Sequence, residues 1–411
     1  MNTQLDKAMQ LATEAGHILL ENGAEICRVE ETMDRIATAY GVGERNFFVL
    51  SNGIIATGHE YAKAEFIPIR GTQLSRIVEV NQLSREVAEG RCTLDQLDHR
   101  LKAIRFSKDK QWWELVLGIA LGVGSFSILF GGSLVDAIAT FVCGVLLGLF
   151  MAFVSPHLSR IFGPLLGGLV GGLLCIASSA VGFGEHLPNM IIGTIIALVP
   201  GVPFTNGMRD LANEDYIAGA TRLLDAFLVF LCSALGVALA FIIDGWITGG
   251  LMQLGAPTTD PTTSKWYIQL AAAFAGTVGF SVLFGAPRRF YLECGLTGTA
   301  GWMVYFLISI ANHELSLAGG AFIAALLVAL VSHLLAVTRK CPVTVFLICG
   351  IIPLVPGGGI FWTAYYLVGN HLPQALATGF LALKITIAIA GGIILASGLY
   401  RLIHKKNRHH G

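Results

Sequence analysis

Hydrophobic and polar positions divide the chain into two regions with different patterns. Before residue 109, apolar residues recur at helical or alternating spacing among many charged ones, whereas from Trp112 onward they form long apolar blocks. Each block is close to the ~20 residues with which an α-helix crosses a bilayer. The pattern therefore predicts a small N-terminal domain followed by a membrane region that is all α-helical.

The N-terminal region, residues 1–108, has the pattern of an α+β domain. A capping box at Thr93 marks the start of its last helix, and the glycines after Tyr40 end its second helix. No basic and apolar leader precedes the domain, so we expect it to stay in the cytoplasm. We predict helices over 5–21, 24–40, 73–89 and 93–104, and a strand pair over 47–57 and 64–69 with a polar connection at 58–63.

The membrane region predicts ten transmembrane helices, five in each half. A Gly-, Pro- and Thr-rich stretch, residues 245–265, separates the halves 112–244 and 266–401, and a basic cytoplasmic tail, 402–411, follows. Because five spans per half is an odd number, the halves must have opposite orientations, which makes 245–265 an extracytoplasmic linker. The expected spans are 113–131, 134–154, 161–181, 187–204, 222–243, 267–285, 290–311, 318–337, 341–355 and 375–400.

The distribution of lysine and arginine agrees with this topology, since basic residues collect in cytoplasmic loops. With the N-terminal domain inside, the expected outer loops contain only Lys265. The expected inner side contains Arg105, Lys108, Lys110, Arg160, Arg209, Arg222, Arg288, Arg289, Arg339, Lys340, Arg401, Lys405, Lys406 and Arg408. Both chain termini are therefore expected in the cytoplasm.

Two short elements occur once in each half and indicate an internal duplication. Phe126–Gly131 reads FSILFG and Phe280–Gly285 reads FSVLFG, 154 residues later. The sequence LVPG occurs at Leu198–Gly201 and again, 156 residues later, at Leu354–Gly357. Internal repeats of a multi-span unit are common in secondary transporters.

The LVPG elements are candidates for a substrate path, because proline removes a helical donor and glycine lets the backbone leave the helix. Unwound backbone at membrane depth is tolerated where it lines a cavity, and transporters hold polar substrates there. A plain helix end or kink is the alternative, and 341–372 can be a broken helix or a re-entrant segment. The path candidates here are Pro200, Gly201, Pro203, Asn206, Pro356, Gly357 and Gly358.

Polar and ionisable residues inside the spans supply further path candidates, because a charge at a helix centre costs roughly 2.5–3.5 kcal/mol on insertion scales. Lys384 suits a substrate carboxylate, and Asp225 an ammonium group or a proton. The alternatives are a structural Asp–Lys pair or an interfacial Asp225. Ser127 and Ser281 can bond a ligand or a neighbouring helix, or equally their own helix.

Coupling to protons needs a group that titrates, and we consider Asp225, Glu293 and His333. A salt bridge with Arg288 or Arg289 is the simpler interpretation of Glu293, and loop or interface positions are the simpler interpretation of His333 and His313. Asp136 begins the second span and is expected to cap it.

Composition excludes several other functions. Charged residues make up only 13% and the formal net charge is zero, so nucleic-acid binding has no electrostatic basis. The eight cysteines are scattered without metal-ligand spacing, and we expect neither a metal nor another cofactor. A Cys–Glu–His hydrolase site can be drawn from Cys27, Glu30 and His59, but a structural helix with an Arg28–Glu31 pair is the favoured interpretation.

The N-terminal motifs resemble a known family. The segments Gly23–Glu30, Ala39–Gly41 and Ser51–Ile54 are similar to the N-terminal domain of the threonine/serine exporter family, and the two halves with their Pro-Gly elements are similar to its membrane region. The likeness covers nearly the whole chain, in the form that fuses two components that are separate in other members. It implies a bacterial inner-membrane exporter driven by the proton motive force.

The leading hypothesis is therefore a secondary exporter of threonine and serine that alternates access between inverted repeats. A dicarboxylate such as succinate is the alternative substrate, which the resemblance to split members suggests. A membrane-anchored hydrolase and a passive channel are the alternatives of other classes. The expected partners are the substrate and the lipid bilayer, and the Gly-rich spans permit packing with a further copy of the chain without requiring it.

Overall fold

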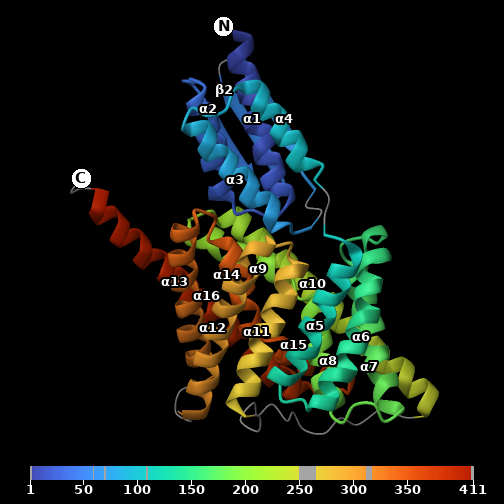
Figure 1. Ribbon diagram of the computed structural model, residues 1–411. Coiled ribbons are helices and arrows are strands. Elements are labelled where there is room, and N and C mark those ends of the chain that lie inside the picture. The colour runs from blue at the N-terminus through green and yellow to red at the C-terminus, as the bar shows by residue number, and fades with distance from the viewer. Residues whose placement is uncertain are drawn as a thin grey trace.

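An α+β domain lies at one end of a bundle of long helices (Figure 1). The computed structural model describes residues 2–58, 60–68, 71–107, 110–249, 265–311 and 317–408. The expected linker 245–265 and the basic tail 402–411 thus fall mostly outside the described residues or side chains.

The N-terminal domain consists of four helices and one antiparallel sheet with strand order β1-β2-β3. The expected capping box is confirmed, with Gln96 N–H donating to Thr93 Oγ1 at 3.4 Å. In order, the elements are α1 (Asn2–Glu21), α2 (Ile26–Ala39), β1 (Asn46–Leu50), β2 (Gly53–Gly58), β3 (Tyr61–Phe66), α3 (Leu74–Ala88) and α4 (Leu94–Arg105).

The predicted strand pair is in fact a three-stranded meander. The run 47–57 contains a two-residue turn at Ser51 and Asn52, so that Leu50 pairs with Gly53. The third strand, Tyr61–Phe66, starts within the stretch predicted as a polar connection. It is an edge strand with largely exposed positions; its first three residues fall in the predicted connection, and its last three fall in the predicted strand 64–69.

The two halves of the membrane region contain the same series of helices. The first half comprises α5 (Trp112–Leu129), α6 (Leu134–Phe153), α7 (Phe162–Ala180), α8 (Leu187–Ile195), α9 (Gly201–Ala212) and α10 (Tyr216–Thr248). The second comprises α11 (Trp266–Leu283), α12 (Tyr291–Ala311), α13 (Leu317–Arg339), α14 (Thr344–Ile351), α15 (Gly357–Val368) and α16 (Leu372–Arg408). Short 3₁₀ turns, η2 (Ile196–Leu198) and η5 (Ile352–Leu354), extend α8 and α14.

The helices establish a multi-span, all-α membrane region. Among the described residues, seven helices are long and apolar enough to cross a bilayer, or up to nine if each of two bent pairs is one span. Those pairs are α8–α9, bent by 61°, and α14–α15, bent by 47°. The helix α12, which matches the expected span 290–311, is not among these nine, so the count of ten stays a prediction.

The helices that carry the hexapeptides, α5 and α11, pack closely side by side. The Phe126 and Phe280 rings, at equivalent positions, meet edge to face with centroids 5.0 Å apart. A Cβ added to Gly122 would lie 3.0 Å from Phe280, and one added to the equivalent Gly276 would lie 2.8 Å from Phe126. Lys110, just before α5, donates to the carbonyl of Ala286, just after α11. The two helices are therefore antiparallel.

The N-terminal domain also rests on the second half of the bundle. The backbone N–H groups of Leu74 and Ser75 donate to the carbonyls of Phe284 and Gly285 at 3.1 and 2.9 Å. These bonds give hydrogen-bond partners to two carbonyls at the end of α11 and to two N–H groups in the first turn of α3. The N-cap residue of α3, Gln73, makes no side-chain cap, so the carbonyls take that role. The second hexapeptide therefore doubles as a docking point for the domain.

Candidate functional site

Both LVPG elements interrupt their spans with the same backbone conformation. Pro200 has φ −78° and ψ 60°, and Pro356 has φ −77° and ψ 56°. In each case the following glycine N–H donates to the carbonyl of the preceding valine, at 2.8 Å for Gly201 and 2.7 Å for Gly357. This is an inverse γ-turn centred on proline, and the valine before it is extended. The expected interruption of both helices is confirmed.

The two interruptions pack against each other reciprocally. A Cβ added to Gly201 would lie 2.6 Å from Cδ1 of Ile352, and a Cβ added to Gly357 would lie 2.8 Å from Cδ1 of Ile196. Gly201 and Gly357 are equivalent in the two halves, as are Ile196 and Ile352. Such an exchange of equivalent contacts is typical of a two-fold relation. Glycine is needed at both positions, because the facing isoleucine occupies the space that a side chain on the glycine would need.

The helices before and after the interruptions form two pairs, each with one helix from either half. On the side of the N-terminal domain α9 contacts α14, and on the opposite side α8 contacts α15. Each pair contains buried polar atoms without a hydrogen-bond partner among the described residues. These atoms are Thr205 Oγ1 and Asn206 Oδ1 in α9, Asn189 Nδ2 in α8, and Trp362 Nε1 in α15.

The loop Asn22–Ile26, between α1 and α2, docks onto α9 and α10 through polar contacts. Asn206 Nδ2 donates to the Gly23 carbonyl at 2.5 Å, and Arg222 Nη2 donates to the Ala24 carbonyl at 2.7 Å. The Ile26 N–H donates to Asp210 Oδ1 at 3.1 Å. The interface therefore lies directly beside the first interrupted span.

Buried charges reinforce the same interface. Glu25 forms an ion pair with Arg209, and Asp210 forms one with Arg222 at 2.6 Å. All four side chains are at most 10% exposed. From the sequence, Arg209 and Arg222 are expected only on the inner side, and Glu25 and Asp210 are not among the site candidates. The missed signal is a charged pair, Arg209-Asp210, that follows a Pro-Gly interruption by only two helical turns.

The other path candidates lie at several places around the interruptions. Pro203 is in the first turn of α9 and Gly358 in that of α15, where a Cβ on Gly358 would be 3.6 Å from Cδ1 of Ile192. Ser281 is buried and donates to the Thr277 carbonyl of its own helix at 2.8 Å. Ser127 is also buried, but its hydroxyl has no partner among the described residues.

The ionisable candidates are separated from one another. Asp225 pairs with Arg160, which precedes α7, and not with Lys384. The Lys384 side chain is on an exposed face of α16 with its ammonium 5.1 Å from the centre of the Phe380 ring. The interfacial alternative for Asp225 therefore has direct geometric support, whereas the Asp–Lys pair does not form.

The proton-coupling candidates Glu293 and His333 lie in the second half. Glu293 pairs with Arg339 at 2.6 Å, not with the neighbouring Arg288, whose partner is Glu114. The His333 ring stacks on Tyr400 with centroids 4.4 Å apart. His313 is outside the described residues.

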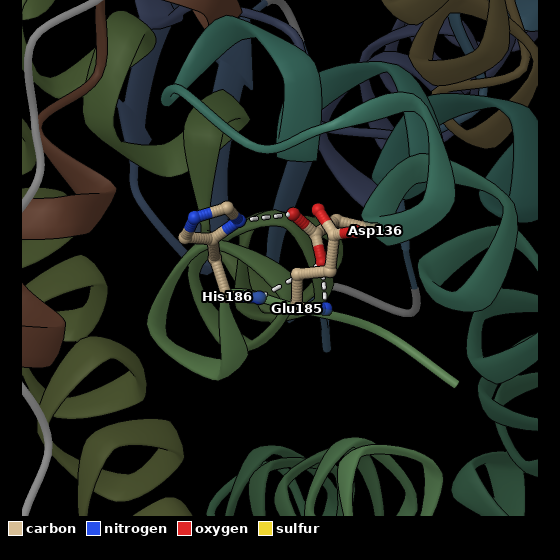
Figure 2. Close-up of side chains that lie close together, drawn as sticks. All are labelled: Asp136, Glu185 and His186. Carbon is tan, nitrogen blue, oxygen red and sulfur yellow. Dashed lines mark hydrogen bonds and ion pairs between the residues drawn. The ribbon is translucent and has the colours of Figure 1, made fainter. Parts of the chain in front are cut away.

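Asp136 caps α6 as expected and also holds the loop before α8 (Figure 2). Its Oδ1 accepts from the backbone of Glu185 and His186, and its Oδ2 accepts from the Ser133 backbone and from His186 Nδ1. The ligand atoms of Asp136, Glu185 and His186 are close enough to surround a cation. However, the four N–H donors already use the Asp136 oxygens, so we assign the cluster a structural role.

The residues considered for a hydrolase do not form a nucleophilic site in the described part of the domain. Burial raises the pKa of the Cys27 thiol to about 11, so it stays protonated at neutral pH. Glu30 accepts from the Val49 backbone N–H at 3.2 Å, and Arg28 and Glu31 form the expected ion pair at 2.9 Å. His59 lies outside the described residues.

Comparisons with known proteins identify relatives along the whole chain. A family model described as "Putative threonine/serine exporter" matches residues 10–243, and one described as "Threonine/Serine exporter, ThrE" matches residues 269–399. The chain is 23% identical to a probable threonine/serine exporter of Mycobacterium tuberculosis, with 96% of this chain and 76% of the relative covered. It is also 23% identical to the threonine/serine exporter of Corynebacterium glutamicum, over 99% and 85% of the two chains.

A third relative matches only part of the chain. The probable succinate transporter subunit YjjP of Escherichia coli is 24% identical over 60% of this chain and 100% of the relative. No solved structure matches. Since the first family model covers more than half of the chain and the second covers most of the remaining membrane half, the protein belongs to the threonine/serine exporter family, in its fused two-component form.

Proposed function

We propose that this protein is a secondary-active exporter of threonine and serine that works by alternating access between two inverted repeats. The reciprocal packing of the two Pro-Gly interruptions carries the proposal. Two facing interruptions bring non-helical backbone from both halves to one point, and transporters built from inverted repeats bind their substrates at such points.

The repeats are proposed to be inverted because equivalent helices run in opposite directions. α5 starts at the end of the bundle where the N-terminal domain lies, and α11 ends there, next to Leu74 and Ser75. With the N-terminal domain in the cytoplasm, the second half is then an upside-down copy of the first. The proposal includes ten spans, five in each half, and both termini on the cytoplasmic side of a bacterial inner membrane.

The substrate path is proposed to pass between the interruptions. Its central part comprises Pro200, Gly201, Pro356 and Gly357, and Pro203 and Gly358 lie in the helical turns that follow. Asn206 and Ser127 contribute buried polar atoms without partners among the described residues. Ser281, Asp225 and Lys384 remain path candidates farther along the helices.

Proton coupling is part of the proposal, since the family resemblance implies export driven by the proton motive force. Asp225, Glu293 and His333 are the candidate groups. Asp225 and Glu293 each have an arginine partner, so protonation of the carboxylate would break an ion pair and change the packing of its helix.

A dicarboxylate is the second candidate substrate, because the relative in Escherichia coli is named a probable succinate transporter subunit. A substrate with two carboxylates needs a cationic group of the protein at each of its ends. The candidates are Arg209 in α9, Arg222 in α10 and Lys384 in α16. Direct competition between unlabelled succinate and labelled threonine separates the two proposals.

The experiment that tests the proposal measures efflux of labelled threonine from preloaded cells. Pro356→Leu should abolish efflux while the protein still inserts, because leucine neither fixes φ nor lacks the N–H, so the span can continue as a helix through the centre of the path. The matched control is Pro373→Leu at the exposed start of α16, which should leave efflux intact. Lys384→Ala tests the carboxylate role of Lys384. Full efflux by both Pro356→Leu and Lys384→Ala would refute the proposed path.

A further inference from the structure

Residues of the N-terminal loop occupy a site on α9 and α10 that has the polarity of a substrate site. The loop presents the Glu25 carboxylate to Arg209, the Ala24 carbonyl to Arg222, and the Ile26 N–H to Asp210. An α-amino acid offers the same kinds of group, a carboxylate at one end and N–H donors at the other. Oxygen atoms of the loop thus bind the guanidinium groups of the membrane helices, and a nitrogen atom of the loop binds their carboxylate, as the groups of such a ligand would.

The membrane helices contain more polar groups than docking of the loop uses. Thr205 Oγ1 and Asn206 Oδ1 belong to side chains that are 0% and 1% exposed, and neither atom has a partner among the described residues. They lie one turn before Arg209 and Asp210 on the same helix. An unpaired buried oxygen is costly, and both oxygens can accept from a donor that a ligand brings to this place.

The shared architecture of the two halves does not require these polar groups. The positions in α15 that correspond to Thr205, Asn206, Arg209 and Asp210 are occupied by the aromatic residues Phe361, Trp362, Tyr365 and Tyr366. The charged set lies in the half whose helices α9 and α10 contact the loop Asn22–Ile26. Buried ion pairs stabilise an interface no better than apolar packing does, so the charges point to binding.

We propose, on the basis of the proposed exporter function, that α9 and α10 form the inner binding site for a zwitterionic hydroxy amino acid, and that the loop Asn22–Ile26 is a tethered mimic that occupies it. The substrate carboxylate binds Arg209 and Arg222, and its ammonium binds Asp210. Thr205 and Asn206 accept from the ammonium or the side-chain hydroxyl of the substrate. The loop must leave before substrate enters from the cytoplasm, so it acts as the inner gate.

The loop has the features that such a movement needs. Gly23 has φ +84°, a conformation that glycine adopts without strain. The first turn of α2 has no side-chain cap from Glu25 and relies on Asp210 for the Ile26 N–H. Three of the polar contacts that this short segment makes with α9 and α10 can be replaced by the substrate: Glu25 with Arg209, Ala24 with Arg222, and Ile26 with Asp210.

The test is threonine binding to the purified full-length protein by calorimetry. Glu25→Gln weakens the mimic, so the free site becomes more populated and the apparent Kd for threonine should fall by up to about tenfold. The matched control Glu31→Gln changes a carboxylate in α2, outside the loop, that pairs with Arg28, and should leave the Kd unchanged. Arg209→Gln, alone or with Glu25→Gln, should raise the Kd at least about tenfold.

A second measurement uses the unaltered chain and does not depend on the folding of a variant. Cys27 lies next to the loop and is partly buried, so release of the loop should expose its thiol. Saturating threonine should speed alkylation of Cys27, followed by mass spectrometry, several-fold, whereas an equal concentration of a non-substrate salt should not.

An unchanged or raised Kd in Glu25→Gln, or alkylation that threonine does not change, overturns the mimic. If the wild-type protein exports threonine in that case, only this inference fails. If the wild-type protein neither binds nor exports threonine, the proposed function fails as well.

Discussion

Addition of one methyl group at Gly201 should destabilise the protein, and loss of one methyl group from Ile352 should reverse the effect. The Cβ of Gly201→Ala would lie 2.6 Å from Ile352 Cδ1, roughly 1 Å inside the usual 3.5–4.0 Å contact. Overpacking of this kind costs about 1–3 kcal/mol of the free energy of unfolding. Ile352→Val removes Cδ1 and alone costs about 0.5–1.5 kcal/mol. The double variant should therefore lose no more than Ile352→Val alone.

The other half of the molecule provides the matched test. Gly357→Ala should be rescued by Ile196→Val, because a Cβ on Gly357 would lie 2.8 Å from Ile196 Cδ1. The crossed combination, Gly201→Ala with Ile196→Val, serves as the control and should show no rescue. Thermal unfolding of the purified protein in detergent measures stability, and threonine efflux measures function.

The size of the rescue decides whether the interruptions face each other. Residues in contact show coupling energies of about 0.5–3 kcal/mol, whereas distant pairs are additive. Coupling of that size in both matched pairs and additivity in the crossed pair would confirm the reciprocal contact. Equal behaviour of matched and crossed pairs would refute it, and with it the argument for a two-fold relation between the halves.

Three further predictions follow from the structure. Alkylation of Cys27 in the absence of substrate should be slow at pH 7 and rise with a midpoint near its pKa of about 11, as quantified by mass spectrometry; a midpoint near 9 would contradict the burial of the thiol. Burial lowers the pKa of Lys110 to about 8, so the unfolded chain binds more protons between about pH 8 and 10.5 and the melting temperature should rise with pH there; Lys110→Met should remove that rise, and an unchanged slope in the variant would count against it. Asp136→Ala should cost about 3 kcal/mol in thermal unfolding, because four N–H donors lose their acceptor, yet should leave the KM for threonine unchanged; a normal melting temperature would show that the loop before α8 is held in another way.

Much of the fold could be predicted from the sequence because apolar blocks and repeats are long-range signals. The interruptions at Pro200 and Pro356 follow from local backbone chemistry and occur where expected. The strand boundary at Ser51 and Asn52 was missed because two strands with a two-residue turn look like one apolar run. The start of edge strand β3 was placed too late, because its first residues are largely exposed and follow directly on a polar stretch.

The contacts between distant segments could not be predicted from the sequence. Nothing near Glu25 indicates that its partner is Arg209, because the two residues are far apart in the chain and belong to different domains. Likewise, Asp225 and Lys384 lie in the corresponding helices α10 and α16 of the two halves, but Asp225 pairs with Arg160. Such pairings depend on the packing of whole helices, which periodicity alone does not describe.

Threonine efflux from proteoliposomes that contain only the purified protein tests the central claim most directly. With labelled threonine inside and a proton gradient imposed across the bilayer, the account predicts efflux well above that of protein-free liposomes. The account also predicts that unlabelled serine competes, and that collapse of the gradient or Pro356→Leu removes the excess. Efflux equal to that of protein-free liposomes would contradict the account, and efflux that persists undiminished without the gradient would identify a passive channel instead.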